Sequence, residues 1–252
     1  MGEQRTEPGP GTGRLSPLQP RLRAHQSTFL AEHPGPEHEA IHMIAAIVDH
    51  VIERCSNPRD VVFDPFAGYG TTLKRALALG REAVGIELLP NRVDELRKQI
   101  PQAHVIEGDS RELLRLLRAV QPPHPRVPVD LILTSPPYMT ERDHLADPLS
   151  GYLQNDGHYV RYLRELELVA AQCARSVVPG GWVIWNVADI HHQGHTTHLI
   201  RDCAEVLGRH LSQVGVSEIF WDRYPHDLVA DALLVYQRPD TSCERVVDAV
   251  EN

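Results

Sequence analysis

Short apolar runs alternate along the chain with longer stretches in which apolar residues recur every three or four positions. The runs are rich in β-branched and aromatic residues, which favours buried strands at 61–63, 83–86, 104–106, 130–133 and 182–187. The helical spacing predicts helices over about 36–54, 72–79, 90–99, 111–120, 158–178 and 197–211. Two further strands, 216–221 and 232–236, follow each other without a helix between them.

This order of elements predicts an α/β fold with a mostly parallel, seven-stranded sheet and helices on both faces. The last two strands should form an antiparallel C-terminal hairpin at one edge, because no helix carries the chain back between them. Residues 25–238 are expected to form one domain, preceded by a disordered Gly/Pro-rich arm at 1–24 and followed by a tail at 239–252. The polar segment 139–156 lacks periodicity and is expected to be a mobile loop.

Composition narrows the class of protein. The 252 residues are 42% apolar and 23% charged, as in ordinary globular domains, and we expect neither a membrane span nor a secretory signal. The four cysteines are widely spaced without a C-x-x-C pair, which favours reduced, packing cysteines in a cytoplasmic protein. The 25 basic and 34 acidic residues leave a formal charge of −9, which argues against gripping nucleic acid by bulk charge.

The first candidate ligand loop is D-P-F-A-G-Y-G-T-T, residues 64–72, between a predicted strand and a predicted helix. Its glycines let the backbone approach a ligand closely, and the helix that follows offers free N–H groups. An ordinary tight turn would explain G-x-G alone, and the dinucleotide pattern G-x-G-x-x-G is not met, but the flanking D-P-F and T-T favour a ligand loop. The candidate cofactor-binding residues here are Asp64, Pro65, Phe66, Ala67, Gly68, Gly70, Thr71 and Thr72.

Acidic residues also stand at the ends of the next two predicted strands. Glu87, 17 residues after Gly70, could accept hydrogen bonds from two ribose hydroxyls, although a solvated loop acid would look the same. Asp109, followed by Ser110, could accept from an adenine amino group or could cap the helix that begins at Arg111.

The fourth predicted strand ends in S-P-P-Y, residues 135–138. Pro136 and Pro137 cannot donate backbone hydrogen bonds and fix a rigid turn, while Ser135 adds a hydroxyl and Tyr138 a flat ring. This set suits a planar substrate whose exocyclic amino group donates to the serine oxygen and a backbone carbonyl while the ring stacks on tyrosine. A Pro-Pro turn is usually structural, but its place one strand after the acidic motifs favours a substrate site.

These four motifs, with G-I-E-L at 85–88 and G-D-S at 108–110, resemble the S-adenosylmethionine-dependent amino-methyltransferases of DNA, the N4-cytosine and N6-adenine enzymes of the S-P-P-Y type. The likeness covers roughly 27–238 and departs from the family at Tyr69, where serine is commoner. It implies a Rossmann-like class I methyltransferase fold, S-adenosyl-L-methionine as cofactor and DNA as substrate, with a specificity subunit or a homodimer as possible partners.

The resemblance also implies roles for individual residues. Glu87 would hold the ribose and Asp109 with Ser110 the adenine. The methionine part of the cofactor would be framed by Asp64, Phe66, Ala67, Gly68 and Gly70. Ser135, Pro136, Pro137 and Tyr138 would be the catalytic residues, which hold the target base while its amino nitrogen displaces the methyl group directly. No covalent intermediate is required, so Ser135 is expected to position the substrate.

Several alternatives remain open at the level of sequence. Serine at position 135 favours N4-cytosine over N6-adenine, and an RNA base or the nitrogen of a small molecule or peptide amide are alternative acceptors. A non-enzymatic regulator would require degraded motifs, whereas all four are intact. His191, His192, His195 and His198 have a spacing that could ligate zinc, but without an accompanying cysteine we expect a polar loop and no metal. Asn186 and Asp189 are further candidates for the pocket wall, and Trp182, Trp185 and Trp221 are expected to pack in the core or at an edge.

Overall fold

The strand that leads into the D-P-F loop is buried along its whole length, as expected for the centre of a parallel sheet. In the computed structural model, which describes residues 15–32, 42–119, 128–142 and 145–239, this strand is β2 (Val61–Asp64). Parallel neighbours flank it on both sides, β3 (Glu82–Glu87) and β5 (Val129–Thr134), and β4 (His104–Glu107) pairs with β3. The apolar runs of the sequence therefore mark the middle of the sheet, where both faces are covered.

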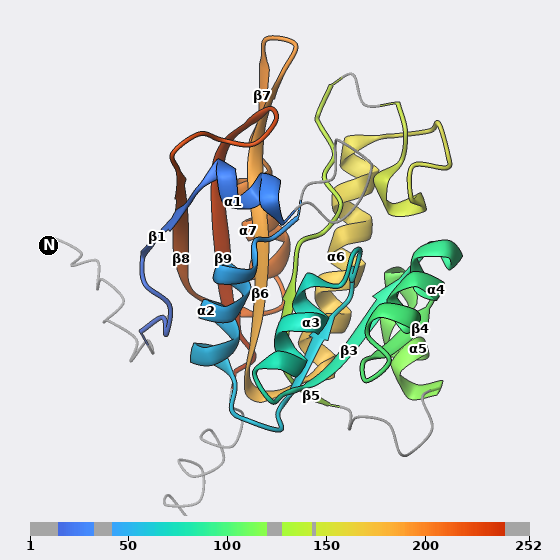
Figure 1. Ribbon diagram of the computed structural model, residues 1–252. Coiled ribbons are helices and arrows are strands. Elements are labelled where there is room, and N and C mark those ends of the chain that lie inside the picture. Colours follow the sequence, from blue (N-terminus) through green and yellow to red (C-terminus); the bar gives the residue numbers. More distant parts are fainter. Residues whose placement is uncertain (1–14, 33–41, 120–127, 143–144, 240–252) are drawn as a thin grey trace, which may run out of the picture.

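The sheet continues beyond β5 with one reversed strand. β6 (Val177–His192) is parallel to β5, whereas β9 (Leu228–Gln237) runs antiparallel to both β6 and β8 (Ser212–Trp221). The complete order is β1-β8-β9-β6-β5-β2-β3-β4. The predicted α/β fold, with its mostly parallel sheet and antiparallel C-terminal hairpin, is confirmed (Figure 1).

Helices cover both faces of the sheet (Figure 1). One face packs against α2 (Ala45–Cys55), α3 (Thr71–Ala78) and α4 (Pro90–Gln99), and the other packs against α5 (Leu113–Ala119), α6 (Tyr159–Ser176) and α7 (Leu199–Gly208). Each of these helices buries the apolar stripe that the spacing of its apolar residues predicts. In α2, for example, Ile47, Val48, Val51 and Ile52 are buried on one side of the helix.

Two strands exceed the seven that the sequence indicated. β1 (Arg21–Ala24) pairs in parallel with β8 and so covers the edge at which the hairpin was expected to end the sheet. β7 (His195–Thr197) folds back on the end of β6, which is much longer than its predicted core of 182–187. β6 begins at Val177 and therefore includes Pro179-Gly180-Gly181, ahead of the apolar run from which the strand was predicted.

The N-terminal boundary also needs correction. Residues 1–14 lie outside the described part of the chain, but Arg21–Ala24 belong to the sheet, followed by the short helix α1 (Gln26–Ala31). Leu22 and Ala24 are buried while Arg21 and Arg23 are exposed, so β1 alternates as an edge strand does. Disorder up to residue 24 is therefore wrong for this part of the arm. Of the helix predicted at 36–54, residues 36–41 lie outside the described part of the chain, 42–44 are described but not helical, and α2 accounts for the remainder.

The segment expected to be a polar loop, 139–156, is described except for 143–144 and contains the short helix η2 (Pro148–Ser150). Met139 and Leu149 are buried, and the Asp147 carboxylate caps η2 by accepting from the N–H of Leu149 at 3.0 Å. Gly151 has a φ of +67°, and a Cβ there would lie 2.9 Å from a methyl of Leu89. This segment therefore packs beside the end of β3 instead of standing clear of the domain. Within the described residues, no helix combines the length and apolarity needed to cross a bilayer.

Candidate functional site

The loop between β2 and α3 turns at two glycines with left-handed backbone conformations. Gly68 has a φ of +51° and Gly70 a φ of +80°, which non-glycine residues adopt only with strain. A Cβ at Gly70 would also lie 2.5 Å from Leu96 and 2.7 Å from Ile100, so α4 leaves no room for a side chain. The loop is held against β3 because the N–H of Ala67 donates to the carbonyl of Ile86 at 2.9 Å.

Glu87, the last residue of β3, is joined directly to this loop. One carboxylate oxygen accepts from the N–H of Gly68 and the other from the N–H of Leu89, both at 2.9 Å. The side chain is 6% exposed, and its burial raises the pKa, an effect opposed by these hydrogen bonds and by the Arg92 guanidinium. Arg92 also lies 4.6 Å above the ring of Tyr69, so the unusual tyrosine of this loop has a cationic partner on α4.

Asp64 connects the glycine loop to the strand that carries S-P-P-Y. Its carboxylate accepts from the Thr134 hydroxyl at 2.6 Å and from the N–H of Phe66 at 3.0 Å. Asp64 is 3% exposed, and burial raises its pKa to about 6 even though these hydrogen bonds favour the ionised form. Because Thr134 directly precedes Ser135, the two motifs share one hydrogen-bonded junction.

The Asp109-Ser110 pair precedes a short helix, and Asp109 acts as its N-terminal cap, one of the two roles that the sequence allowed. Asp109 caps the short helix η1 (Ser110–Glu112), accepting from the N–H of Arg111 at 2.9 Å. Its carboxylate is also ion-paired with the Arg111 guanidinium, which bonds Glu165 of α6 at 2.7 Å as well. Ser110 is buried, and its hydroxyl donates to the carbonyl of Pro65. Ser110 is thus built into the glycine loop, whereas Asp109 is engaged by an arginine.

The S-P-P-Y turn is held at both ends. The Ser135 hydroxyl bonds the Tyr138 Oη at 3.2 Å, and the Tyr138 hydroxyl donates to the carbonyl of Asn186 on β6, also at 3.2 Å. Tyr162, on α6, donates its hydroxyl to the carbonyl of Pro137 at 2.9 Å. Tyr138 is only 8% exposed and belongs to the core cluster, so its ring does not present an open stacking face in this structure.

A buried carboxylate lies behind this turn. The Asn186 amide donates to Asp231 at 2.6 Å and to the carbonyl of Ala232 at 3.2 Å, and the Trp221 indole N–H donates to the other oxygen of Asp231 at 2.8 Å. Asp231 is 8% exposed, and burial raises its pKa to about 6. Asn186 was expected near the pocket wall, whereas Asp231 was not foreseen. Trp185 is fully buried, as expected, and Trp221 contributes a specific hydrogen bond.

The four histidines of the β6–β7 hairpin do not converge. His195 pairs with Glu141 at 2.6 Å, His198 with Asp189 at 3.2 Å and His192 with Asp227 at 3.1 Å, while His191 bonds the Thr196 hydroxyl. Each imidazole therefore has a different partner. Among the described residues, no group of three potential ligands could hold a metal ion.

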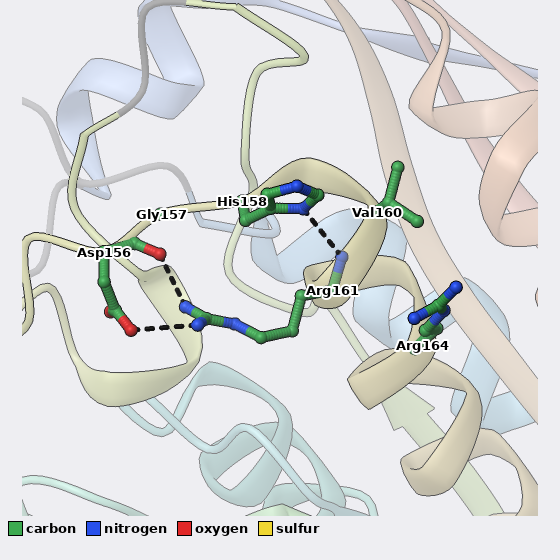
Figure 2. Close-up of a pocket in the computed structure, with 6 residues that line it drawn as sticks. All are labelled: Asp156, Gly157, His158, Val160, Arg161 and Arg164. Carbon is green, nitrogen blue, oxygen red and sulfur yellow. Dashed lines mark hydrogen bonds and ion pairs between the residues drawn. The ribbon is translucent and has the colours of Figure 1, made fainter.

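A pocket opens at the start of α6 and is lined by residues of that helix and of the segment before it (Figure 2). Arg161 bonds both the carboxylate of Asp156, at 2.9 Å, and its backbone carbonyl, at 2.6 Å. His158 caps the helix by accepting from the N–H of Arg161 at 3.3 Å. None of the residues assigned to the cofactor or the base lines this pocket, so it is a separate surface feature with two arginines, Arg161 and Arg164.

The structure thus brings most of the predicted site residues together at the carboxyl ends of β2, β3 and β5. Gly68 meets Glu87, Ser110 meets Pro65, and Asp64 meets the strand that delivers Ser135. Sequence reasoning missed Arg92, Tyr162 and Asp231. Asp231 had a usable signal, since a carboxylate inside the apolar run L-V-A-D-A-L-L-V is unusual for a buried strand.

Comparison with known proteins points to one family. A family model described as DNA methylase matches residues 25–98, which hold the glycine loop and Glu87. The type II methyltransferase M.HinfI of Haemophilus influenzae is 36% identical over 83 residues, 33% of this chain and 22% of that protein. The DNA adenine methyltransferase YhdJ of Escherichia coli K12 is 39% identical over 69 residues, 27% of this chain and 21% of that protein. The matches span about a fifth of the length of these relatives.

Solved structures share the fold at low identity. TrmN from Thermus thermophilus superposes with a TM-score of 0.53 at 16% identity, covering 78% of this chain and 49% of that one. The N-methyltransferase NodS from Bradyrhizobium japonicum gives a TM-score of 0.51 at 12% identity, covering 77% and 94% respectively. This likeness establishes the Rossmann-like methyltransferase fold.

Proposed function

Since the chain is related to the DNA amino-methyltransferases through the matched segment 25–98, we propose that it transfers a methyl group from S-adenosyl-L-methionine to the exocyclic amino group of a DNA base. The observation that carries this proposal is the junction between the two motifs. The glycine loop with Glu87 and the S-P-P-Y turn meet through the hydrogen bond from Thr134 to Asp64. A cofactor site and a substrate site are therefore adjacent.

The residues around the glycine loop fit this cofactor. Gly68 carries no side chain to cover the loop backbone, where a Cβ would meet only the carbonyl of Phe66 at 3.8 Å, and Glu87 presents a buried carboxylate that can accept further hydrogen bonds from a ribose diol. Asp64 and Phe66 to Gly70 would lie along the methionine part, and Asp109 with Ser110 near the adenine. When bound, S-adenosyl-L-methionine supplies a methyl group on a positively charged sulfur.

The S-P-P-Y turn would hold the amino group of the base. One N–H would donate to the Ser135 oxygen and the other to the carbonyl of Pro136, because Tyr162 already engages the carbonyl of Pro137. These two acceptors favour a pyramidal nitrogen, whose lone pair becomes available for direct displacement. The carbon–sulfur bond breaks as the carbon–nitrogen bond forms, and the amine then loses a proton to water. A base in a duplex would have to be flipped out to reach this turn.

The target base is proposed to be cytosine, methylated at N4. Serine at position 135 favours this choice, whereas a relative named for adenine methylation keeps N6-adenine as the competing outcome. An RNA base is a further outcome of the same assay.

Contact with DNA requires local positive charge on this acidic chain. The pocket at the start of α6 is lined by the exposed Arg164 and by Arg161, which is ion-paired with Asp156 (Figure 2). Tyr162, the residue after Arg161 on the same helix, bonds the carbonyl of Pro137 in the turn. We assign phosphate contacts to this surface, with a specificity subunit or a second copy of the chain as a source of further contacts. A cytoplasmic location agrees with this role.

The proposal is tested by offering methyl-labelled S-adenosyl-L-methionine with duplex DNA, single-stranded DNA, RNA or a mixture of small amines. Label is expected in DNA, and replacing Ser135 by Ala should abolish most of it. Label confined to RNA or to small molecules would refute the DNA assignment. Label in no acceptor, from protein that binds S-adenosylhomocysteine, would refute the activity itself.

A further inference from the structure

The hydrogen bonds of the S-P-P-Y turn have a direction. The carbonyl of Asn186 can only accept, so at 3.2 Å the Tyr138 hydroxyl must donate its proton to it. The Tyr138 oxygen is then left as an acceptor, and the Ser135 hydroxyl, 3.2 Å away, donates to it. The proton of Ser135 is thereby directed into the protein, and the lone pairs of its oxygen remain available on the other side.

We propose that Tyr138 is a positioning residue that acts through its hydroxyl, holding Ser135 as a hydrogen-bond acceptor for the amino group of the substrate. This role rests on the proposed function, because only an amine donor requires Ser135 to accept. A serine free to rotate would spend part of its time pointing its proton at the substrate, where two N–H donors would face a third donor. The role differs from base stacking, which needs the ring and not the hydroxyl.

The carbonyl of Asn186, at which this series of hydrogen bonds begins, is fixed in place. Asn186 lies in the middle of the β6–β9 pairing, opposite Leu233, so its backbone has little freedom. Its side chain is tied to Asp231, which Trp221 holds from the other side. Asn186 and Asp231 are both buried, and water therefore competes poorly for these hydrogen bonds. Asp231 and Trp221 support the Asn186 carbonyl, and through it Tyr138 and Ser135.

The packing of Tyr138 supports a role for its hydroxyl over its ring. The ring is 8% exposed and packs in the core cluster, and burial holds the pKa of the hydroxyl well above its usual range. The hydroxyl therefore keeps its proton at neutral pH and remains a donor. Tyr162 pins the neighbouring carbonyl of Pro137, which limits rotation of the turn as a whole.

A double-mutant cycle tests this role. Tyr138→Phe, Ser135→Ala and the double variant are compared with the wild type for kcat and KM of methyl transfer, with S-adenosylhomocysteine affinity by calorimetry and the urea midpoint alongside. Tyr138→Phe keeps the ring and should lower kcat about tenfold, with the KM for DNA and the cofactor affinity little changed. The double variant should be no worse than Ser135→Ala alone, because Tyr138 acts through Ser135.

Tyr236→Phe is the matched control. Tyr236 is also buried and also donates its hydroxyl to a backbone carbonyl, that of Ala204 at 2.7 Å, but it lies away from the turn on β9. Its replacement should lower the urea midpoint by as much as Tyr138→Phe does and leave kcat unchanged.

Three results would overturn the proposal. Unchanged kcat in Tyr138→Phe would reduce Tyr138 to packing or stacking. Losses that multiply in the double variant would show that Tyr138 acts independently of Ser135. Equal loss of kcat in Tyr236→Phe would reveal a general effect of destabilisation. A wild type that methylates no nucleic acid, small amine or amide would instead refute the proposed function, and the role of Tyr138 with it.

Discussion

Ser135 is the residue on which the proposed chemistry depends most directly. It is half-buried at the end of β5, one residue beyond the hydrogen bond that links Thr134 to Asp64. In the proposed reaction its contribution would be a single acceptor atom in a fixed place, because direct methyl transfer requires neither nucleophilic nor acid–base chemistry from it. Positioning of this kind affects the transfer step far more than the binding of the cofactor.

Ser135→Ala is accordingly expected to reduce kcat by about 10- to 100-fold, the effect of one lost hydrogen bond to a reacting group. Affinity for S-adenosylhomocysteine, measured by calorimetric titration, should remain within about threefold of the wild type. An equally large loss of that affinity would contradict the separation of the two sites. Ser150→Ala is a suitable control, since Ser150 is also near a strand end but bonds only within its own loop.

The residues found from sequence and those missed differ in the range of their contacts. Gly68, Gly70 and Asp64 stand in one contiguous motif between a strand and a helix, so local pattern was sufficient. Tyr162 contacts the turn through Pro137, 25 positions away in the sequence, and Asp231 bonds Asn186, 45 positions away, so neither contact is visible in a local pattern. Tyr138 was correctly placed in the turn, but its expected open ring is buried, because its neighbours in space come from β6 and the helices behind it.

At the scale of elements, the start of α3 shows how tightly the glycine loop is built. Gly70 is the N-cap of α3 and lies against α4, which leaves no space for a Cβ. Gly80 follows the same helix at its other end with a similar φ of +76°, but a Cβ there would meet nothing within 4 Å. Substitutions at these two glycines therefore distinguish the energetic cost of a left-handed backbone from the cost of steric overlap.

Gly80→Ala should cost about 1 kcal/mol of unfolding free energy, from the left-handed backbone alone. Gly70→Ala should cost about 1–3 kcal/mol more, because Leu96 and Ile100 must move. Urea denaturation of the two variants measures this difference. Equal losses would mean that α4 accommodates the extra methyl, and the tight contact would then have no energetic consequence.

Elements were predictable where their pattern was long. The helix expected at 90–99 matches α4 at both ends, since Pro90 begins it and the apolar stripe of Val93 and Leu96 is regular. β1 was not predicted because four residues are too few to show alternation, and the prolines and glycines that precede it in the sequence favour disorder. β7 was not predicted because its residues are as polar as those of a loop, and only its pairing with β6 makes it a strand.

At the scale of the whole molecule, Asp64 and Asp231 are two of the carboxylates buried at the carboxyl edge of the sheet. Burial raises the pKa of both Asp64 and Asp231 from 3.8 to about 6. Because the folded state binds their protons more tightly than the unfolded state, each group makes the protein more stable below about pH 4 than above pH 6. The stability lost as the pH rises through this window is about 3 kcal/mol for each group. At neutral pH, the buried charges of Asp64 and Asp231 therefore lower the unfolding free energy, which uncharged side chains at the same positions would not do.

Asp231→Asn removes one of these charges. The difference in unfolding free energy between variant and wild type should shift in favour of the variant, by up to about 3 kcal/mol, as the pH rises from about 4 to 8. Any fixed effect of the lost hydrogen bond does not vary with pH and cancels in this comparison. Urea midpoints at a series of pH values supply the data, and a difference independent of pH would show that Asp231 titrates normally.

The acidic composition of the chain bears on how it meets its substrate and leaves the chemistry untouched. With a formal charge of −9, the protein cannot rely on a general attraction to DNA, and the arginines at the start of α6 form a small local surface. The proposed reaction requires only a cofactor loop and two acceptors, and the residues proposed for both lie within the described part of the chain.

The identity of the methylated atom tests the central claim most directly. DNA treated with the protein and labelled S-adenosyl-L-methionine is digested to nucleosides, which are separated and identified by mass spectrometry. The account predicts N4-methylcytosine, strongly reduced in the Ser135→Ala reaction. N6-methyladenine would leave the reaction type as proposed but change the target base. A methyl group on a ring carbon, on a ring nitrogen, or only on RNA or protein would contradict it.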